Sequence, residues 1–243
     1  KYMCGWHFSI RAFELRCKVL DKQRLEDIVR GATILGTGGG GTARRGWTRL
    51  LQALRENREV KLVKPRDVPD DATAAVVFGM GSPAISNERW LAIQLSKALE
   101  GLQDHLGRKI DVVSPLEIGG TNTALALYTG AKAEIPTVDG DGAGRSIPEL
   151  DMTTYNIFGV PVNPMAIADA LGNLVVLERA VDAYTAEKIG RMVVVQLGGI
   201  AGVAAWPMTG RQLKEVVIPH TVTMAEKLGR TVREKKAVGE DPI

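Results

Sequence analysis

The sequence predicts an α/β fold, with a mostly parallel sheet that has helices on both faces and a smaller mixed α/β C-terminal segment. Two observations support this prediction. Short apolar runs of strand length alternate with longer amphipathic stretches of helical period over the first 180 residues. Such alternation is typical of parallel sheets whose crossover helices cover both faces.

Each element has a local signal. A helix begins after Asp21, a good N-cap residue, and a second helix carries Trp47, Leu50 and Leu54 on one face. The apolar runs predict strands at 60–63, 74–78, 110–113 and 135–138, with helices at 87–106 and 123–133 between them. After Pro164 the pattern changes to a strand at 174–177, a helix at 183–191, two strands within 192–205 joined by Gly198-Gly199, and a helix at 219–230.

This change in pattern suggests three regions. Residues 1–20 form an N-terminal extension that packs on the body or on a partner subunit. Residues 21–180 form an α/β domain with glycine-rich and acidic loops. Residues 181–243 are the start of a second, incomplete domain.

Composition excludes several classes of protein. The 31 Lys and Arg residues exceed the 28 Asp and Glu residues by only three, and this excess is spread along the chain. We therefore expect no nucleic-acid or membrane surface. No apolar run approaches the roughly 18 residues of a membrane-spanning helix. The two cysteines lack the spacing of a metal finger, and residues 1–20 do not have the pattern of a secretory signal, so we expect a cytoplasmic protein.

The run Gly38-Gly39-Gly40-Gly41 is the first candidate site. Glycines allow backbone N–H groups to converge on an anion or a carbonyl oxygen. The run follows a helix rather than a strand, and no Gly-Lys-Ser/Thr comes after it, so neither standard phosphate-binding pattern applies. The alternative is a tight connection between two helices. We expect a binding loop.

The second candidate follows the strand at 110–113. Glu117 could act as a general base or hold a ligand N–H, and Thr121 and Asn122 could bind a carbonyl group. Gly119-Gly120 leads into a helix whose first amides are free. The alternative is an ordinary helix N-terminal turn with Thr121 or Asn122 as the cap.

The third candidate, residues 139–149, directly follows a strand and contains Asp139, Asp141, Arg145 and Glu149. Clustered acids favour a metal ion or an acid/base pair, so Asp139 and Asp141 are candidate ligands of a divalent metal ion. Arg145 could neutralise Asp141 or bind a substrate carboxylate with both nitrogens. The alternative is an Asp-Gly turn network without a catalytic role.

These three stretches resemble a family found beside hydantoinase and oxoprolinase genes, whose N-terminal part is associated with S-methyl-thiohydantoin desulfurases. The resemblance covers about residues 21–243. It is carried by the segments Arg30–Gly41, Glu117–Asn122 and Asp139–Glu149, in this order and spacing. Members of the family are longer, with a β-rich C-terminal part.

The resemblance implies a hydrolase acting on a small cyclic amide, imide or thiohydantoin-like ring. In this interpretation the glycine amides of the first two stretches stabilise a developing oxyanion. Asp139 or Asp141 activates water, Glu117 handles the second proton, and Arg145 and Glu149 help to hold the substrate.

Two other interpretations stay open. The chain could be a ligand-binding or partner subunit of a hydantoinase-like or oxoprolinase-like complex, with a separate C-terminal-domain partner. The glycine loop alone would also fit a nucleotide-binding protein. In each case we expect a homo-oligomer.

Overall fold

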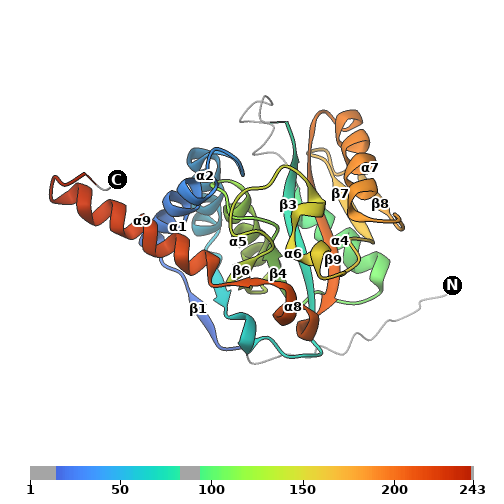
Figure 1. Cartoon of the computed structure of the whole chain (residues 1–243), viewed down its shortest axis with the longest axis horizontal. Helices are drawn as coiled ribbons and strands as arrows, with labels where there is room; N and C mark the ends of the chain where they lie inside the picture. Colours follow the sequence, from blue (N-terminus) through green and yellow to red (C-terminus); the bar gives the residue numbers. More distant parts are fainter. Residues whose placement is uncertain (1–14, 83–93, 242–243) are drawn as a thin grey trace.

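The computed structural model describes residues 15–82 and 94–241 (Figure 1). The helices are α1 (Lys22–Leu35), α2 (Ala43–Arg55), α4 (Leu95–Leu106), α5 (Asn122–Ala133), α6 (Thr154–Ile157), α7 (Ala183–Gln196), α8 (Gly210–Val216) and α9 (Thr221–Ala237), with 3-10 turns η1 (Pro65–Asp67) and η2 (Leu150–Met152). The strands are β1 (Cys17–Val19), β2 (Lys61–Val63), β3 (Thr73–Gly81), β4 (Val112–Pro115), β5 (Thr137–Val138), β6 (Gly140–Asp141), β7 (Met165–Ala168), β8 (Leu174–Leu177), β9 (Ile200–Thr209) and β10 (Ile218–Pro219).

The main sheet has the strand order β1-β2-β5-β4-β3-β9-β7-β8. Strands β2, β5, β4 and β3 pair in parallel, as crossover connections through helices require. Strands β1, β9 and β8 run in the opposite direction, and β7 runs with the parallel group. The predicted α/β class is confirmed. A second, two-stranded sheet joins β6 to β10.

Strand β3 shows how both faces of the sheet are covered. Ala75 and Val77 pack into a core that contains residues of α4 and α5. Val76 and Phe78 belong to a different core, with residues of α7 and α8. Because alternate residues of a strand point to opposite faces, helices lie on both sides of the sheet. A third core, under α1, α2 and α9, packs against the outer side of α5.

Helices α1 and α9, far apart in sequence, lie side by side at one end of the molecule (Figure 1). A Cβ atom on Gly31 or Gly229 would collide with the backbone of the other helix, so these glycines allow the close approach. The buried Asp27 accepts hydrogen bonds from Arg233 Nε and Nη2 at 3.0 Å each. The N-cap predicted for α1 is confirmed, since the Asp21 side chain accepts from the Arg24 amide at 2.9 Å.

The C-terminal half departs from the sequence prediction. Residues 192–196 continue α7 and do not form a strand, so the prediction of two strands within 192–205 is wrong. A single strand, β9, follows and enters the sheet between β3 and β7. The two segments on either side of residue 180 therefore share one sheet, and their division into two domains stays a prediction.

The N-terminal side also differs in detail. Strand β1 falls within the predicted extension and pairs with β2 at one edge of the sheet. Strand β3 runs on to Gly81, three residues beyond the end of the strand predicted at 74–78. Of the helix predicted over 87–106, residues 95–106 are helical, and residues 87–93 lie outside the described residues.

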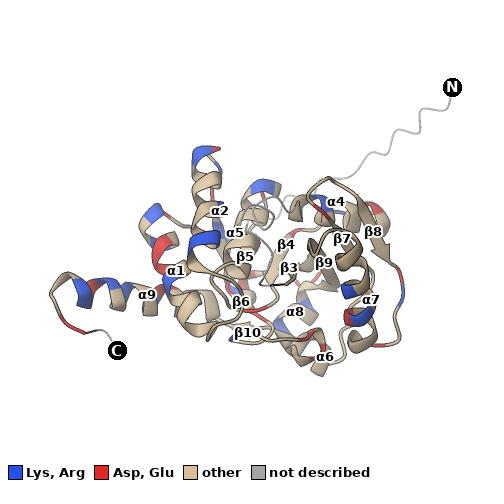
Figure 2. Cartoon of the chain, turned by 90° about the horizontal axis from the view of Figure 1, so that it is seen from above, with Lys and Arg blue, Asp and Glu red and all other residues tan. Residues whose placement is uncertain are grey.

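No described helix combines the length and the apolar character needed to cross a membrane. Figure 2 shows basic segments on α9, α2 and α7, with acidic segments between them. Helices α7 and α9 carry charges of both signs, whereas α2 carries arginines and no Asp or Glu.

Candidate functional site

A cavity of about 720 Å³ lies where the three predicted stretches meet. The glycine loop after α1, the turn after β4 and the loop after β6 all line it, together with the end of β3 and one face of α7. Its polar and charged lining includes Glu117, Asn122, Ser146, Arg45, Arg145, Glu149, Glu187 and Arg191. Residues of all three stretches therefore line one cavity.

The glycine loop packs backbone to backbone against the turn that contains Glu117. Gly40 O accepts hydrogen bonds from the amides of Thr121 and Asn122 at 2.8 and 3.0 Å. Gly40 has a positive φ of 66°, and a Cβ atom there would lie 2.5 Å from Gly119 Cα. Glycine is required at both positions because the two backbones touch.

Several groups of the turn that were expected to bind a ligand form hydrogen bonds within the protein instead. The Gly119 amide donates to Thr123 Oγ1 at 3.0 Å, and the Thr121 hydroxyl donates to Thr42 O at 3.1 Å. The Gly120 Cα faces the glycine loop, since a Cβ there would meet Gly41 O at 2.9 Å. The first amides of α5 were expected to be free, but those of Thr121 and Asn122 are bonded to Gly40 O.

The glycine loop itself keeps unpaired amides. Gly39 N donates to Gly36 O at 2.9 Å. The amides of Gly38, Gly40 and Gly41 donate no hydrogen bond to any other residue in the described ranges. All three residues have positive φ and line the cavity. Successive amides in such conformations can form an anion-binding concavity.

Glu117 is the carboxylate at the centre of the site. Its side chain is 4% exposed, and both oxygens accept hydrogen bonds. Oε2 accepts from the Ser146 hydroxyl at 2.9 Å and from the Ile147 amide at 2.7 Å, and Oε1 accepts from Asn122 Nδ2 at 2.6 Å. Burial raises the pKa of Glu117 above its ordinary value, although these three donors act to lower it.

The rim of the cavity carries exposed charges from the third stretch. Arg145 Nη2 donates to Thr37 Oγ1 at 3.0 Å, so it links the acidic loop to the glycine loop. Glu149 is exposed and lines the same cavity. Arg145 and Glu149 therefore both lie at the cavity, and their roles toward a substrate stay predictions.

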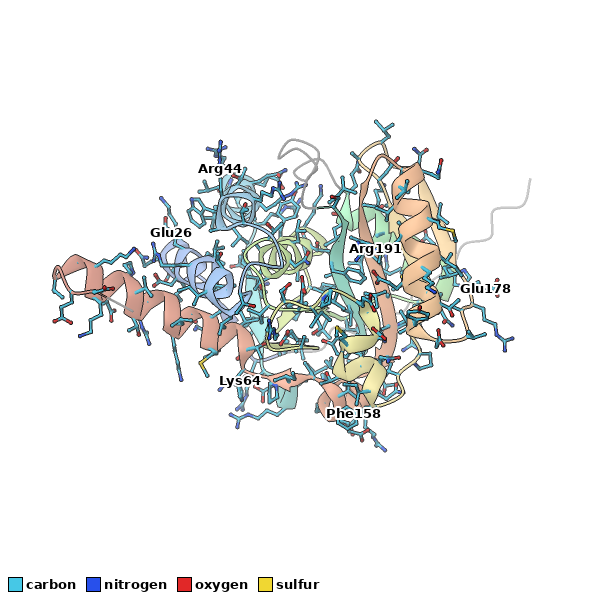
Figure 3. All side chains as sticks on the ribbon, turned by 45° about the horizontal axis from the view of Figure 1, so that its top comes forward. Glu26, Arg44, Lys64, Phe158, Glu178 and Arg191 are labelled. Carbon is cyan, nitrogen blue, oxygen red and sulfur yellow. The ribbon has the colours of Figure 1, made fainter. Side chains whose placement is uncertain are left out.

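Three charged residues of the cavity were missed in the sequence. Arg45, in the first turn of α2, is largely buried. Arg191, labelled on α7 in Figure 3, pairs with the buried Glu187 (Nε to Oε1, 2.5 Å) and donates to Pro148 O at 3.2 Å. Glu187 and Arg191 are four residues apart on a helix, which is also the spacing of ordinary surface ion pairs. Their sequence therefore carries no signal of a site.

Asp139, expected to be catalytic, does not line the cavity. It is 2% exposed, and its oxygens accept hydrogen bonds from the Thr223 amide at 2.8 Å and the Thr223 hydroxyl at 2.7 Å, with His220 Nδ1 at 3.2 Å. Thr223 lies in the first turn of α9. Asp139 therefore caps a helix N-terminus, where a negative charge also interacts favourably with the helix dipole.

Asp141 is also outside the cavity lining and is fully buried. Its oxygens accept from the amides of Ala143 and Gly144, at 3.1 and 2.8 Å, and these bonds form the turn that leads to Ser146 and Ile147. Burial raises the pKa of Asp141 to about 7, and the negative charge of Glu117 acts in the same direction.

Within residues 15–82 and 94–241, no group of three or more His, Cys, Asp or Glu side chains is arranged to hold a metal ion. The oxygens of Asp139 and Asp141 bind two separate sets of protein donors. Metal ligation by this pair stays a prediction.

The raised pKa of Asp141 predicts a specific pH dependence of stability. The folded state holds the proton up to about pH 7, whereas the unfolded chain releases it near pH 3.8. The free energy of unfolding should therefore fall as the pH rises from about 4 to about 7, and remain low above that. At about 1.4 kcal/mol for each pKa unit, the loss approaches about 4 kcal/mol.

Urea unfolding of the wild type and of Asp141→Asn, measured from pH 5 to 8, tests this expectation. Asp141→Asn should show a flatter decline with pH, because the substitution removes the titrating group. The exposed Asp104→Asn serves as a control and should follow the wild-type profile. Parallel profiles for all three proteins would contradict the buried titration.

The fold and the cavity define an α/β protein with a small-molecule-sized pocket at the junction of three loops, lined by glycine backbone and several charged side chains. The family model described as the S-Me-THD-like N-terminal domain matches residues 23–179, and the model of the S-Me-THD-like C-terminal domain matches residues 181–243. The chain belongs to the S-Me-THD-like family.

The chain is also similar to a solved structure. The crystal structure of a protein from Chromobacterium violaceum has a TM-score of 0.79 and 30% sequence identity to this chain. The match covers 90% of this chain and 62% of that protein. No match was found among the curated proteins.

Proposed function

We propose that this chain is a hydrolase-like enzyme that acts on a small cyclic amide, imide or S-methyl-thiohydantoin-like ring. The observation that carries the proposal is the position of Glu117. A buried carboxylate with a raised pKa lines the same cavity as three unpaired glycine amides. A general base and hydrogen-bond donors for developing negative charge are the two parts that hydrolysis of a ring carbon requires.

The cavity suits a ring of this kind. Pockets for small molecules commonly have volumes of about 300–1,000 Å³, and 720 Å³ lies within that range. Such a ring presents carbonyl-type acceptors and an N–H group. In the proposal, the acceptors face the amides of Gly38, Gly40 and Gly41, and Glu117 faces the reacting carbon and its water. Arg145, bonded to the glycine loop, orients the substrate at the rim.

For an S-methyl-thiohydantoin the proposed reaction balances without an oxidant or a reductant. Glu117 takes a proton from water, and the water oxygen forms a bond to the ring carbon that carries sulfur. Negative charge develops on the ring and is stabilised by the glycine amides. The carbon–sulfur bond then breaks. The departing methanethiolate takes the proton from Glu117 and becomes methanethiol. The products are a hydantoin and methanethiol. Attack at a ring carbonyl would instead break the C–N bond and open the ring.

Turnover by the purified chain tests the proposal. The protein is incubated with an S-methyl-thiohydantoin or an unsubstituted hydantoin, and methanethiol release and ring opening are followed. We expect one of the two cyclic substrates to be hydrolysed, with an open-chain S-methyl-isothiourea as the negative control. Binding of both rings without turnover would contradict the enzymatic proposal and favour a ligand-binding subunit.

A further inference from the structure

The hydrogen bonds of Glu117 leave one part of its carboxylate open. A carboxylate has about four acceptor positions, two on each oxygen. Oε2 uses both of its positions, for the Ser146 hydroxyl and the Ile147 amide. Oε1 uses one, for Asn122 Nδ2 at 2.6 Å. The remaining acceptor position of Glu117 is therefore on Oε1.

This oxygen lies beside the glycine loop. A Cβ atom placed on Gly40 would stand 3.3 Å from Glu117 Oε1. Oε1 is therefore a close neighbour of Gly40, which lines the cavity and has an unpaired amide.

The Asn122 side chain can hold Glu117 in only one way. Its Oδ1 accepts from the Gly79 amide at 3.0 Å, at the end of β3. Because a backbone amide is a donor, the Asn122 amide group cannot flip without placing two donors together. Nδ2 must therefore face Glu117. Asn122 is 7% exposed, and its own amide donates to Gly40 O, so it contacts the glycine loop, β3 and Glu117 at once.

We propose that Asn122 is a positioning residue that holds Glu117 with the open acceptor position of Oε1 toward the glycine loop, and that it is not the carbonyl-binding substrate ligand expected from the sequence. The assignment of Oε1 as the reacting oxygen rests on the proposed function. The positioning of Glu117 by Asn122 does not, because it is a property of the protein without substrate.

Asn122→Asp is the most direct test. The substitution keeps the shape and the acceptor for the Gly79 amide, but replaces the donor to Oε1 with a like charge. The pKa of Glu117 should rise by about one unit or more. A ¹³C NMR titration of the Glu carboxyl carbons in the full chain measures this shift without substrate, and the spectrum of Glu117→Gln assigns the signal. The acid limb of the kcat/KM profile should move to higher pH by the same amount.

Two further variants keep the test decisive if Asn122→Asp does not fold. Asn122→Ala removes the donor without adding a charge, so kcat should fall at least about tenfold, with KM changed by less than about twofold. Ser146→Ala removes one of the two donors to Oε2 and leaves the Ile147 amide, so its effect on kcat should be smaller.

Asn57→Asp is the control for Asn122→Asp. It makes the same chemical change at an exposed site outside the cavity, and should leave the titration of Glu117 unmoved.

The outcomes separate the two proposals. An unchanged Glu117 titration in the Asn122 variants would overturn the positioning role. A raised KM with an unchanged kcat and pH profile would also overturn it and restore a substrate-binding role. If the wild type turned over no ring substrate while the Glu117 titration still moved, the proposed function would fail and the positioning role would stand.

Discussion

Glu117→Gln is expected to lower kcat/KM for the ring substrate by about 10²–10⁴-fold, the usual contribution of a general acid or base. The amide of glutamine cannot take a proton from water. The substitution also replaces one acceptor oxygen with an NH₂ donor, at a site where all the protein partners of the carboxylate are donors. Ser146 and Ile147 donate to one oxygen and Asn122 to the other, so one of these donors would face the new NH₂ group. We therefore also expect a loss of about 1–3 kcal/mol of stability.

Measurements of kcat/KM and of urea unfolding separate the two effects of Glu117→Gln. Glu178→Gln is the matched control, since Glu178 is exposed and lies at the outer edge of the molecule in Figure 3. It should leave both quantities unchanged. Retention of full activity by a folded Glu117→Gln protein would exclude the proposed base.

Gly40→Ala is expected to have the largest effect on the glycine loop. A residue with a side chain at φ +66° costs about 1–2 kcal/mol, and forcing its Cβ against Gly119 Cα at 2.5 Å adds about 1–3 kcal/mol. The expected loss of stability is therefore about 2–5 kcal/mol. Any relaxation must separate the glycine loop from the Glu117 turn, so activity should fall even in the folded fraction.

Gly107→Ala provides a control for backbone strain alone. Gly107 ends α4 at φ +62°, and a Cβ there would meet no heavy atom within 4 Å. Unfolding experiments on both variants should show a cost of about 1–2 kcal/mol for Gly107→Ala and a larger cost for Gly40→Ala. Equal costs would mean that the contact between the two loops contributes nothing.

Much of the fold could be predicted because the spacing of apolar residues along the sequence reflects which side chains are buried. Strand β3 is buried on both faces and therefore reads as a continuous apolar run. The stretch Val193–Val195 misled the prediction because β-branched residues favour strands. In the structure these residues end α7, with Val194 buried and Val195 65% exposed. These valines are helical because they continue the helix formed by residues 183–191 and pack as part of it. A run of three residues does not reveal either fact.

The candidate site was predicted in its loops but not in all of its side chains. Glycine-rich stretches after regular elements signalled where backbones approach each other. The sequence could not show which way each acid points: Asp139 caps α9 from 84 residues away, and Asp141 folds back on its own turn. Contacts with distant elements set these directions. Glu117 was identified because it directly follows a strand in a turn with two glycines.

The most direct test of the central claim is a crystal structure of this chain soaked with a hydantoin, which is the product of S-methyl-thiohydantoin hydrolysis and the substrate of ring opening. We predict electron density for the ring between the Gly38–Gly41 loop and Glu117, with a ring atom within hydrogen-bonding distance of Glu117 Oε1. Density for the ring elsewhere, with this cavity empty at saturating hydantoin, would contradict the account.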